Sequence, residues 1–311
     1  MSLARALELA ERGRGTTRPN PVVGAVVVRN GNVVGEGWHE RAGGPHAEVA
    51  ALEQAGDLAR GATLFVTLEP CSHHGRTPPC VDAVLAAGIS RVVAGSLDPS
   101  EHGGGGEALR AAGLDVELVD SFEARAQNEA WRTWASHRRP HVTYKVAATL
   151  DGRIALPGSR WISGEESRRL VHELRAASDA VAVGMGTVRA DAPALTARGV
   201  EAVRQPRRLA FGRGPLPESS GLELRSGPLE DELRALAAEE VQSVLLEGGP
   251  TLASAFVAAD LVDKVLVFVA PSLSGSGAGL LESLAGPVRL SRLSARPIGE
   301  DVLLSAYVHE P

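Results

Sequence analysis

The sequence predicts an α/β protein of two domains, and three observations support this. Stretches with the apolar period of a strand alternate with stretches of helical period along most of the chain. The 311 residues are enough for two domains of ordinary size. A helical pattern over 121–139 ends at Pro140, so we place the boundary between domain 1–140 and domain 141–311.

Local signals predict the elements of the first domain in order. An amphipathic helix over 2–13 is broken by Pro19-Asn-Pro21, and Asn30-Gly31 is a turn pair typical of a hairpin between strands. The glycine run over 103–106 predicts a mobile loop rather than a phosphate-binding turn. The strands are predicted over 22–28, 33–38, 62–68, 91–95 and 115–119, and further helices over 46–54, 80–87 and 107–112.

The second domain is predicted to open with a strand over 141–148. Ser163 and Glu166 have the spacing of a capping box, which predicts a helix start there. The segment Glu247-Gly-Gly-Pro-Thr251 lies between a strand and a helix that ends near 259. Further strands are predicted over 179–183, 241–246 and 264–269, whereas 199–240 has no readable pattern.

Composition excludes several classes of protein. Lys and Arg number 32 against 38 Asp and Glu, so the net charge is −6 and no basic field exists for general nucleic-acid binding. No apolar stretch reaches the ~18 residues of a membrane span. The two cysteines are too few for a disulfide scaffold. We therefore expect a cytoplasmic protein with reduced thiols and no nucleic-acid or membrane partner.

His46-Ala-Glu48, Cys71 and Cys80 together predict a zinc site. A catalytic zinc ion takes three protein ligands and keeps a fourth position for water. A glutamate beside such a site can move a proton between the water and the leaving group, as in the zinc deaminases of nucleobases. The eight residues between the cysteines exceed the usual two. His73 and His74 are interpreted as loop residues at the mouth of the site rather than ligands.

Longer motifs carry a family resemblance. The deaminase half of the bifunctional riboflavin-biosynthesis deaminase–reductases is similar to 18–24, 37–43, 45–48 and the long run Thr67-Leu-Glu-Pro-Cys-Ser-His-His-Gly-Arg-Thr-Pro-Pro-Cys80. Its reductase half is similar to 145–153, 161–163, 191–196 and 247–252. The resemblance implies a cytidine-deaminase-like three-layer αβα domain followed by a dihydrofolate-reductase-like α/β domain.

The resemblance also implies a two-step activity. The first half would remove an amino group from the pyrimidine ring of 2,5-diamino-6-(ribosylamino)pyrimidinone 5′-phosphate, and the second would reduce the ribosyl side chain to ribityl with NADPH. His46, Cys71 and Cys80 would bind zinc, and Glu48 would carry the proton. Asn20, His39 and Arg76 would contact the substrate, although each has an ordinary structural alternative as a turn, strand-end or loop residue. The family further implies a homodimer.

In the second half the same resemblance assigns two groups of residues. The substrate would face Lys145, Ser159, Arg175, Leu195, Arg198 and Glu247. NADPH would contact Ala147, Trp161, Thr187, Asp191, Gly249, Pro250, Thr251, Leu252, Ala253, Ser254 and Ala255. The residue types by themselves support the contacts to phosphate groups, because free N–H groups at a helix start and arginine side chains bind phosphates well. The local pattern at 247–251 fits an ordinary strand-to-helix turn as well as it fits a phosphate-binding turn.

Two departures from the family pattern leave alternatives open. Asp98-Pro-Ser-Glu101 replaces an expected Asp-Pro-Asn-Pro, and Phe211-Gly-Arg-Gly214 stands where a strand ending in Asp-Ser is expected. Arg213 is a candidate for the extra phosphate of NADPH. One alternative is a zinc deaminase whose reductase half is inactive or altered. The other is a non-catalytic nucleotide-binding protein with a structural zinc ion.

Overall fold

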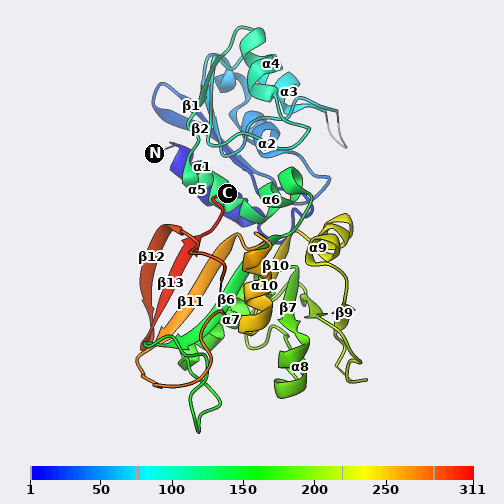
Figure 1. Cartoon of the computed structure of the whole chain (residues 1–311). Helices are drawn as coiled ribbons and strands as arrows, with labels where there is room; N and C mark the ends of the chain where they lie inside the picture. Colours follow the sequence, from blue (N-terminus) through cyan, green and yellow to red (C-terminus); the bar gives the residue numbers. More distant parts are fainter. Residues whose placement is uncertain (1, 75–77, 219, 283) are drawn as a thin grey trace. The chain divides into compact units, whose positions relative to one another are not determined.

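A computed structural model describes residues 2–74, 78–218, 220–282 and 284–311 (Figure 1). The chain divides into two compact units, Met1–His137 and Arg138–Glu310. Each unit has its own sheet and its own core. Within the described ranges, no helix is both long enough and apolar enough to cross a membrane.

A five-stranded sheet forms the centre of the first unit. Its strands are β1 (Gly24–Arg29), β2 (Asn32–Trp38), β3 (Thr63–Val66), β4 (Arg91–Ala94) and β5 (Asp115–Leu118), in the order β2-β1-β3-β4-β5. Strand β1 is antiparallel to both neighbours, whereas β3, β4 and β5 are parallel. Asn30 and Gly31 have φ angles of 50° and 81°, the left-handed backbone that a two-residue hairpin turn requires.

Helices cover both faces of this sheet. Helices α2 (Ala47–Ala55), α3 (Cys80–Ala86) and α4 (Gly105–Ala111) pack on one face, and α1 (Ser2–Ala10) packs on the other. Two further helices, α5 (Phe122–Gln127) and α6 (Glu129–His137), complete the unit. Gly37 allows α2 to lie against β2, because a Cβ atom there would come within 2.5 Å of the Ala47 carbonyl oxygen.

The second unit contains an eight-stranded, mostly parallel sheet. Its order is β12-β13-β11-β6-β10-β7-β8-β9, and only β13 runs opposite to the other strands, pairing antiparallel with β11 on one side and β12 on the other. The strands are β6 (His141–Thr149), β7 (Ala180–Gly184), β8 (Arg207–Phe211), β9 (Glu223–Arg225), β10 (Ser243–Leu246), β11 (Lys264–Ala270), β12 (Ser291–Ile298) and β13 (Asp301–Tyr307). Helices α7 (Glu165–Ala177) and α8 (Met185–Asp191) pack on one face, and α9 (Leu229–Ala238) and α10 (Pro250–Ala258) pack on the other.

Two local predictions were wrong, and a segment without a readable pattern contains three elements. Helix α7 has no side-chain cap from Ser163; instead Asp301 accepts hydrogen bonds from the Gly164 N–H at 2.8 Å and the Ser167 hydroxyl at 2.5 Å. The second half of the 103–106 glycine run begins α4 rather than forming a loop, and a Cβ atom on Gly105 would lie 1.7 Å from the Pro70 carbonyl oxygen. The unreadable segment 199–240 holds β8, β9 and α9.

Asp263 connects three chain segments of the second unit. Its carboxylate accepts hydrogen bonds from the Arg139 guanidinium at 2.7 and 2.6 Å, from the Val142 N–H at 2.8 Å and from His309 Nδ1 at 3.2 Å. Burial tends to raise the pKa of Asp263, but Arg139 and His309 outweigh it and hold that pKa well below its ordinary value. The start of β6 is thereby fixed beside the start of β11 and the end of β13.

We predict that Asp263→Ala lowers the free energy of unfolding by about 3–5 kcal/mol, because it leaves a buried guanidinium without its partner. Urea denaturation followed by circular dichroism measures this. Asp260→Ala is the matched control, since the Asp260 side chain is 81% exposed and contacts the same histidine. An exposed pair of this kind contributes at most about 1 kcal/mol. Equal losses in the two variants would contradict the prediction.

Candidate active sites

Three potential zinc ligands converge in the first unit. His46 precedes α2, Cys80 is the first residue of α3, and Cys71 lies in the loop after β3. His46 Nδ1 is 3.1 Å from Cys80 Sγ and 3.6 Å from Cys71 Sγ, and all three ligand atoms lie within 4.8 Å of one another. Zinc bonds of about 2.0 Å to nitrogen and about 2.3 Å to sulfur suit these separations. The residues therefore fit a zinc ion with one open position.

The surroundings favour a thiolate at Cys71. A hydrogen bond with Cys80 lowers the pKa of the Cys71 thiol, and His46 lowers it further. The Cys80 N–H, at the start of α3, also donates to Cys71 Sγ at 3.3 Å. Because thiolate is the form that binds zinc, the chain holds this ligand ready for the metal.

Glu48 lies in the first turn of α2, two residues after the histidine ligand. Its side chain is buried, and this burial raises the pKa of the carboxyl group. A carboxyl group whose pKa moves toward neutrality can both accept and release a proton at the working pH. Glu48 is therefore suited to proton transfer and is not needed as a ligand.

Asn20 and His39 lie beside this cluster. His39 Nδ1 is 2.9 Å from the Pro45 carbonyl oxygen, which only accepts, so this nitrogen donates. Burial lowers the pKa of His39, so the ring is neutral and its Nε2 accepts from the Asn20 amide at 3.2 Å. Since His39 is only 3% exposed, it orients Asn20 rather than reaching a ligand itself. Arg76, the third predicted substrate contact, lies outside the described residues.

Glu69 is a residue of this site that sequence reasoning missed. Its buried carboxylate accepts hydrogen bonds from the Gly106 N–H at 2.8 Å and the Asp98 N–H at 3.3 Å. Glu69 thus attaches the chain just before Cys71 to α4 and to the loop after β4. The sequence signal was its position next to Pro70-Cys71, but its partners are 29 and 37 residues away.

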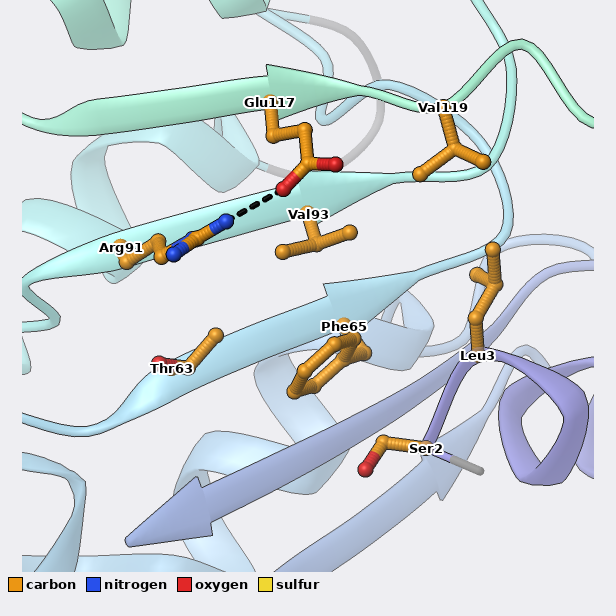
Figure 2. Close-up of a pocket in the computed structure, with 8 residues that line it drawn as sticks. All are labelled: Ser2, Leu3, Thr63, Phe65, Arg91, Val93, Glu117 and Val119. Carbon is orange, nitrogen blue, oxygen red and sulfur yellow. Dashed lines mark hydrogen bonds and ion pairs between the residues drawn. The ribbon is translucent and has the colours of Figure 1, made fainter.

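The loop histidines and a pocket of the first unit do not belong to the ligand cluster. His73 stacks on His102 with ring centroids 3.8 Å apart, and the ligand group found within the described ranges includes neither His73 nor His74. Figure 2 shows a pocket of about 380 Å³ between α1 and strands β3 to β5. Its Phe65 points away from Leu64, which packs toward α2 and α3, so this pocket is on the opposite face of the sheet.

A buried ionic cluster marks the second unit. Glu247, just after β10, accepts hydrogen bonds from Arg175 at 2.6 and 3.0 Å and from Lys145 Nζ at 3.3 Å. Burial tends to raise the pKa of Glu247, but Lys145 and Arg175 outweigh this effect and bring it to about 2. The fork of Arg175 therefore holds Glu247 in this structure, while the Arg198 side chain is exposed.

Two strand-to-helix turns adjoin this cluster. Gly249 immediately precedes α10, and Gly184 precedes α8 at the end of the neighbouring parallel strand β7. A Cβ atom on Gly249 would lie 3.8 Å from Thr187 Oγ1, whereas one on Gly186 would meet nothing within 4 Å. Free N–H groups at the start of α10 therefore face an open space beside Thr187, as a dinucleotide requires.

The other predicted residues of this unit differ in accessibility. Leu195 and Ala253 have buried side chains, so either residue could contact a ligand only through its backbone. Thr251 and Ser254 hydrogen-bond to the side chain and backbone of Glu282, respectively, and Ser159 bonds to the Trp161 carbonyl. The exposed residues include Ser159, Trp161, Asp191, Arg198, Thr251 and Ala255, while Ala147, Pro250 and Leu252 are partly buried.

Comparisons with known proteins agree with this arrangement. The profile of the cytidine and deoxycytidylate deaminase zinc-binding region matches residues 2–96, and that of the RibD C-terminal domain matches residues 140–304. The riboflavin biosynthesis protein RibD of Escherichia coli is 41% identical over 97% of both chains. That of Aquifex aeolicus is 40% identical over 96% of this chain and 95% of its own length.

The chain belongs to the RibD family. An Acinetobacter baumannii RibD structure superposes with a TM-score of 0.86 at 36% identity, covering 98% of this chain and 97% of the other. A Thermotoga maritima structure, a diaminohydroxyphosphoribosylaminopyrimidine deaminase/5-amino-6-(5-phosphoribosylamino)uracil reductase, gives 0.84 at 37% identity with the same coverage. The predicted family and fold class are thus confirmed. As a RibD protein, the chain is a riboflavin-biosynthesis enzyme with a zinc-dependent deaminase domain and an NADPH-dependent reductase domain.

We predict that Glu48→Gln lowers the deaminase kcat by about 10²–10⁴-fold and leaves the bound zinc unchanged, because the amide cannot transfer the proton and the three ligands remain. Plasma emission spectrometry measures the metal, and ammonia release measures the reaction. Cys80→Ser is the comparison variant, in which zinc and deaminase activity should fall together. Loss of zinc from Glu48→Gln would instead identify Glu48 as a ligand.

Proposed function

We propose that the protein catalyses two consecutive steps on one metabolite. The first unit would hydrolyse the amino group from the ring of 2,5-diamino-6-(ribosylamino)pyrimidinone 5′-phosphate. The second would reduce the ribosyl side chain of the product to ribityl with NADPH. The observation that carries this proposal is the presence of one complete polar cluster in each unit, His46–Cys71–Cys80 with Glu48 and Lys145–Glu247–Arg175.

In the deamination, residues of the first unit bind the ring and move the proton. A zinc ion held by the three ligands supplies a Lewis acid that lowers the pKa of water toward about 7. Glu48 takes the proton from the attacking water and delivers it to the ring nitrogen substituent, which leaves as ammonia. The Asn20 amide, oriented by His39, binds the polar edge of the pyrimidine.

In the reduction, residues of the second unit position the sugar and its charge. NADPH supplies the hydride, which needs no protein nucleophile. Lys145 would polarise the reacting end of the ribosyl group, and Glu247 holds its ammonium at a distance of 3.3 Å. Arg198, exposed beside this cluster, is the cation available for the 5′-phosphate.

The test separates the two steps with two variants. The wild-type protein should release ammonia from the diamino substrate and then consume NADPH. The consumption is measured as the loss of the near-ultraviolet absorbance of NADPH. Glu48→Gln should block the first step only. Glu247→Gln should slow the second by about 10²-fold, since one neutral amide cannot hold both cations in place. NADPH consumption that is absent even with the deaminated intermediate would favour a deaminase with an inactive reductase half.

We also propose that the protein is a cytoplasmic homodimer. The support lies in the second unit, where Leu293 on β12, Val302 on β13, and Val288 and Leu290 just before β12 expose 40–70% of their surface. Apolar side chains gathered at a sheet edge suit contact with a second copy. The cytoplasm would keep both free cysteines reduced for zinc.

The expected mass from light scattering is therefore twice the 32.4 kDa of one chain. Leu293→Glu should shift the protein toward the monomer, because it places a charge on the apolar surface. Glu300→Lys, a charge change on the exposed turn between β12 and β13, is the control and should leave the dimer intact. A wild-type monomer at all concentrations would refute the dimer.

A further inference from the structure

The order of the strands fixes how a dinucleotide can lie in the second unit. Strands β6, β10, β7 and β8 are parallel neighbours in that order, so their carboxyl ends form one edge of the sheet. Lys145 is on β6, the open helix start at Gly249 follows β10, and Thr187 follows β7. A cofactor with its pyrophosphate at α10 and its nicotinamide toward Lys145 would extend its adenosine toward the end of β8.

Two arginines stand at that end. Arg189 of α8 donates a hydrogen bond from Nη2 to the Arg213 carbonyl oxygen at 2.8 Å. Both side chains are exposed, and neither guanidinium forms an ion pair with a carboxylate in the described part of the chain. The contact holds the turn after β8 against α8. It therefore brings the Arg189 guanidinium beside the backbone that carries Arg213.

The end of β8 also lacks the group that would repel a phosphate. Enzymes that use NAD commonly place a carboxylate on the adenosine ribose, whereas an arginine there accommodates the 2′-phosphate of NADP. Here Phe211 is buried and packs edge-to-face on Phe256, at 5.4 Å between ring centroids. Gly212, with φ of 131°, has backbone that an aspartate would adopt only with strain.

The next strand offers no competing cation. Arg225 lies opposite Phe211 on β9, but its guanidinium pairs with Glu223, Glu232 and Glu239. Exposed carboxylates near the turn are Asp191 and Glu218. Asp191 follows Arg189 by two residues on the helix, a spacing at which side chains do not face each other.

We propose that Arg189 and Arg213 together bind the 2′-phosphate and make this reductase select NADPH over NADH. The inference rests on the proposed reductase function and names the residues that discriminate between the two cofactors. Arg189 acts from α8 and also fixes the turn that carries Arg213. The 2′-phosphate, with a charge of about −2, meets two guanidinium groups that present planar pairs of N–H donors.

Binding of adenosine 2′,5′-bisphosphate and of 5′-AMP to the full-length protein, measured by calorimetry, tests this without turnover. The wild-type protein should bind the bisphosphate more tightly. Arg189→Ala and Arg213→Ala should each reduce that preference by about tenfold, and 5′-AMP binding should hardly change. Arg213→Lys should restore part of the preference, since it keeps the charge but loses the fork. The ratio of NADPH to NADH affinity should fall in parallel.

Arg234→Ala on α9 is the control, because this exposed arginine pairs only with Glu230 and Asp231 of its own helix. It should leave the preference unchanged, and retained binding of 5′-AMP verifies that the second unit of each variant is folded. Unchanged bisphosphate preference in the double variant would overturn the inference while the reductase proposal stands. A wild-type protein that binds neither NADPH nor NADH would overturn both.

Discussion

The shared constraint in this protein is that parallel strands bring their carboxyl ends, and the turns that follow, to one edge of a sheet. In the first unit β3 and β4 end side by side, so the loop that carries Glu69 and Cys71 meets the loop that carries Asp98. Glu69 accepts hydrogen bonds from the Asp98 N–H and from the Gly106 N–H in the first turn of α4. In the second unit β6, β10, β7 and β8 end together. Residues separated by tens or hundreds of positions therefore share one site, and each site depends on the register of its strands.

Buried carboxylates maintain this arrangement, and their partners decide what each one does. Asp263 and Glu247 are held as anions because guanidinium and ammonium groups outweigh the cost of burial. Glu69 is satisfied by two backbone N–H groups. Glu48 has no such cationic partner strong enough to offset its burial, so its pKa rises. A buried carboxyl group thus serves as a structural anion at Asp263 and Glu247 and is suited to carry a proton at Glu48.

The two chemistries make different demands on the chain. Deamination needs metal ligands at fixed distances from one another. The candidate ligands lie at the starts of α2 and α3 and in a loop that the hydrogen bonds of Glu69 hold in place. Hydride transfer needs a long cofactor aligned along a sheet edge, so its proposed determinants spread from Lys145 to the end of β8. This explains why the deaminase residues occur in compact motifs, whereas the reductase residues are scattered over more than 100 positions.

The sequence by itself determined the family, the α/β class and most elements, and it predicted the three residues of the candidate zinc site, because hairpin turns, hydrophobic periods and the Glu69–Cys80 run are local patterns. Only the tertiary structure decided contacts between distant residues. Asp301 caps α7 from 134 residues away, Gly105 is required by the Pro70 carbonyl, and Arg189 meets the turn of Arg213. The segment 199–240 was unreadable because its short strands β8 and β9 are stabilised mainly by pairing in the sheet. The local sequence pattern predicts the helices and strands, whereas packing and strand order decide which distant residues each side chain contacts.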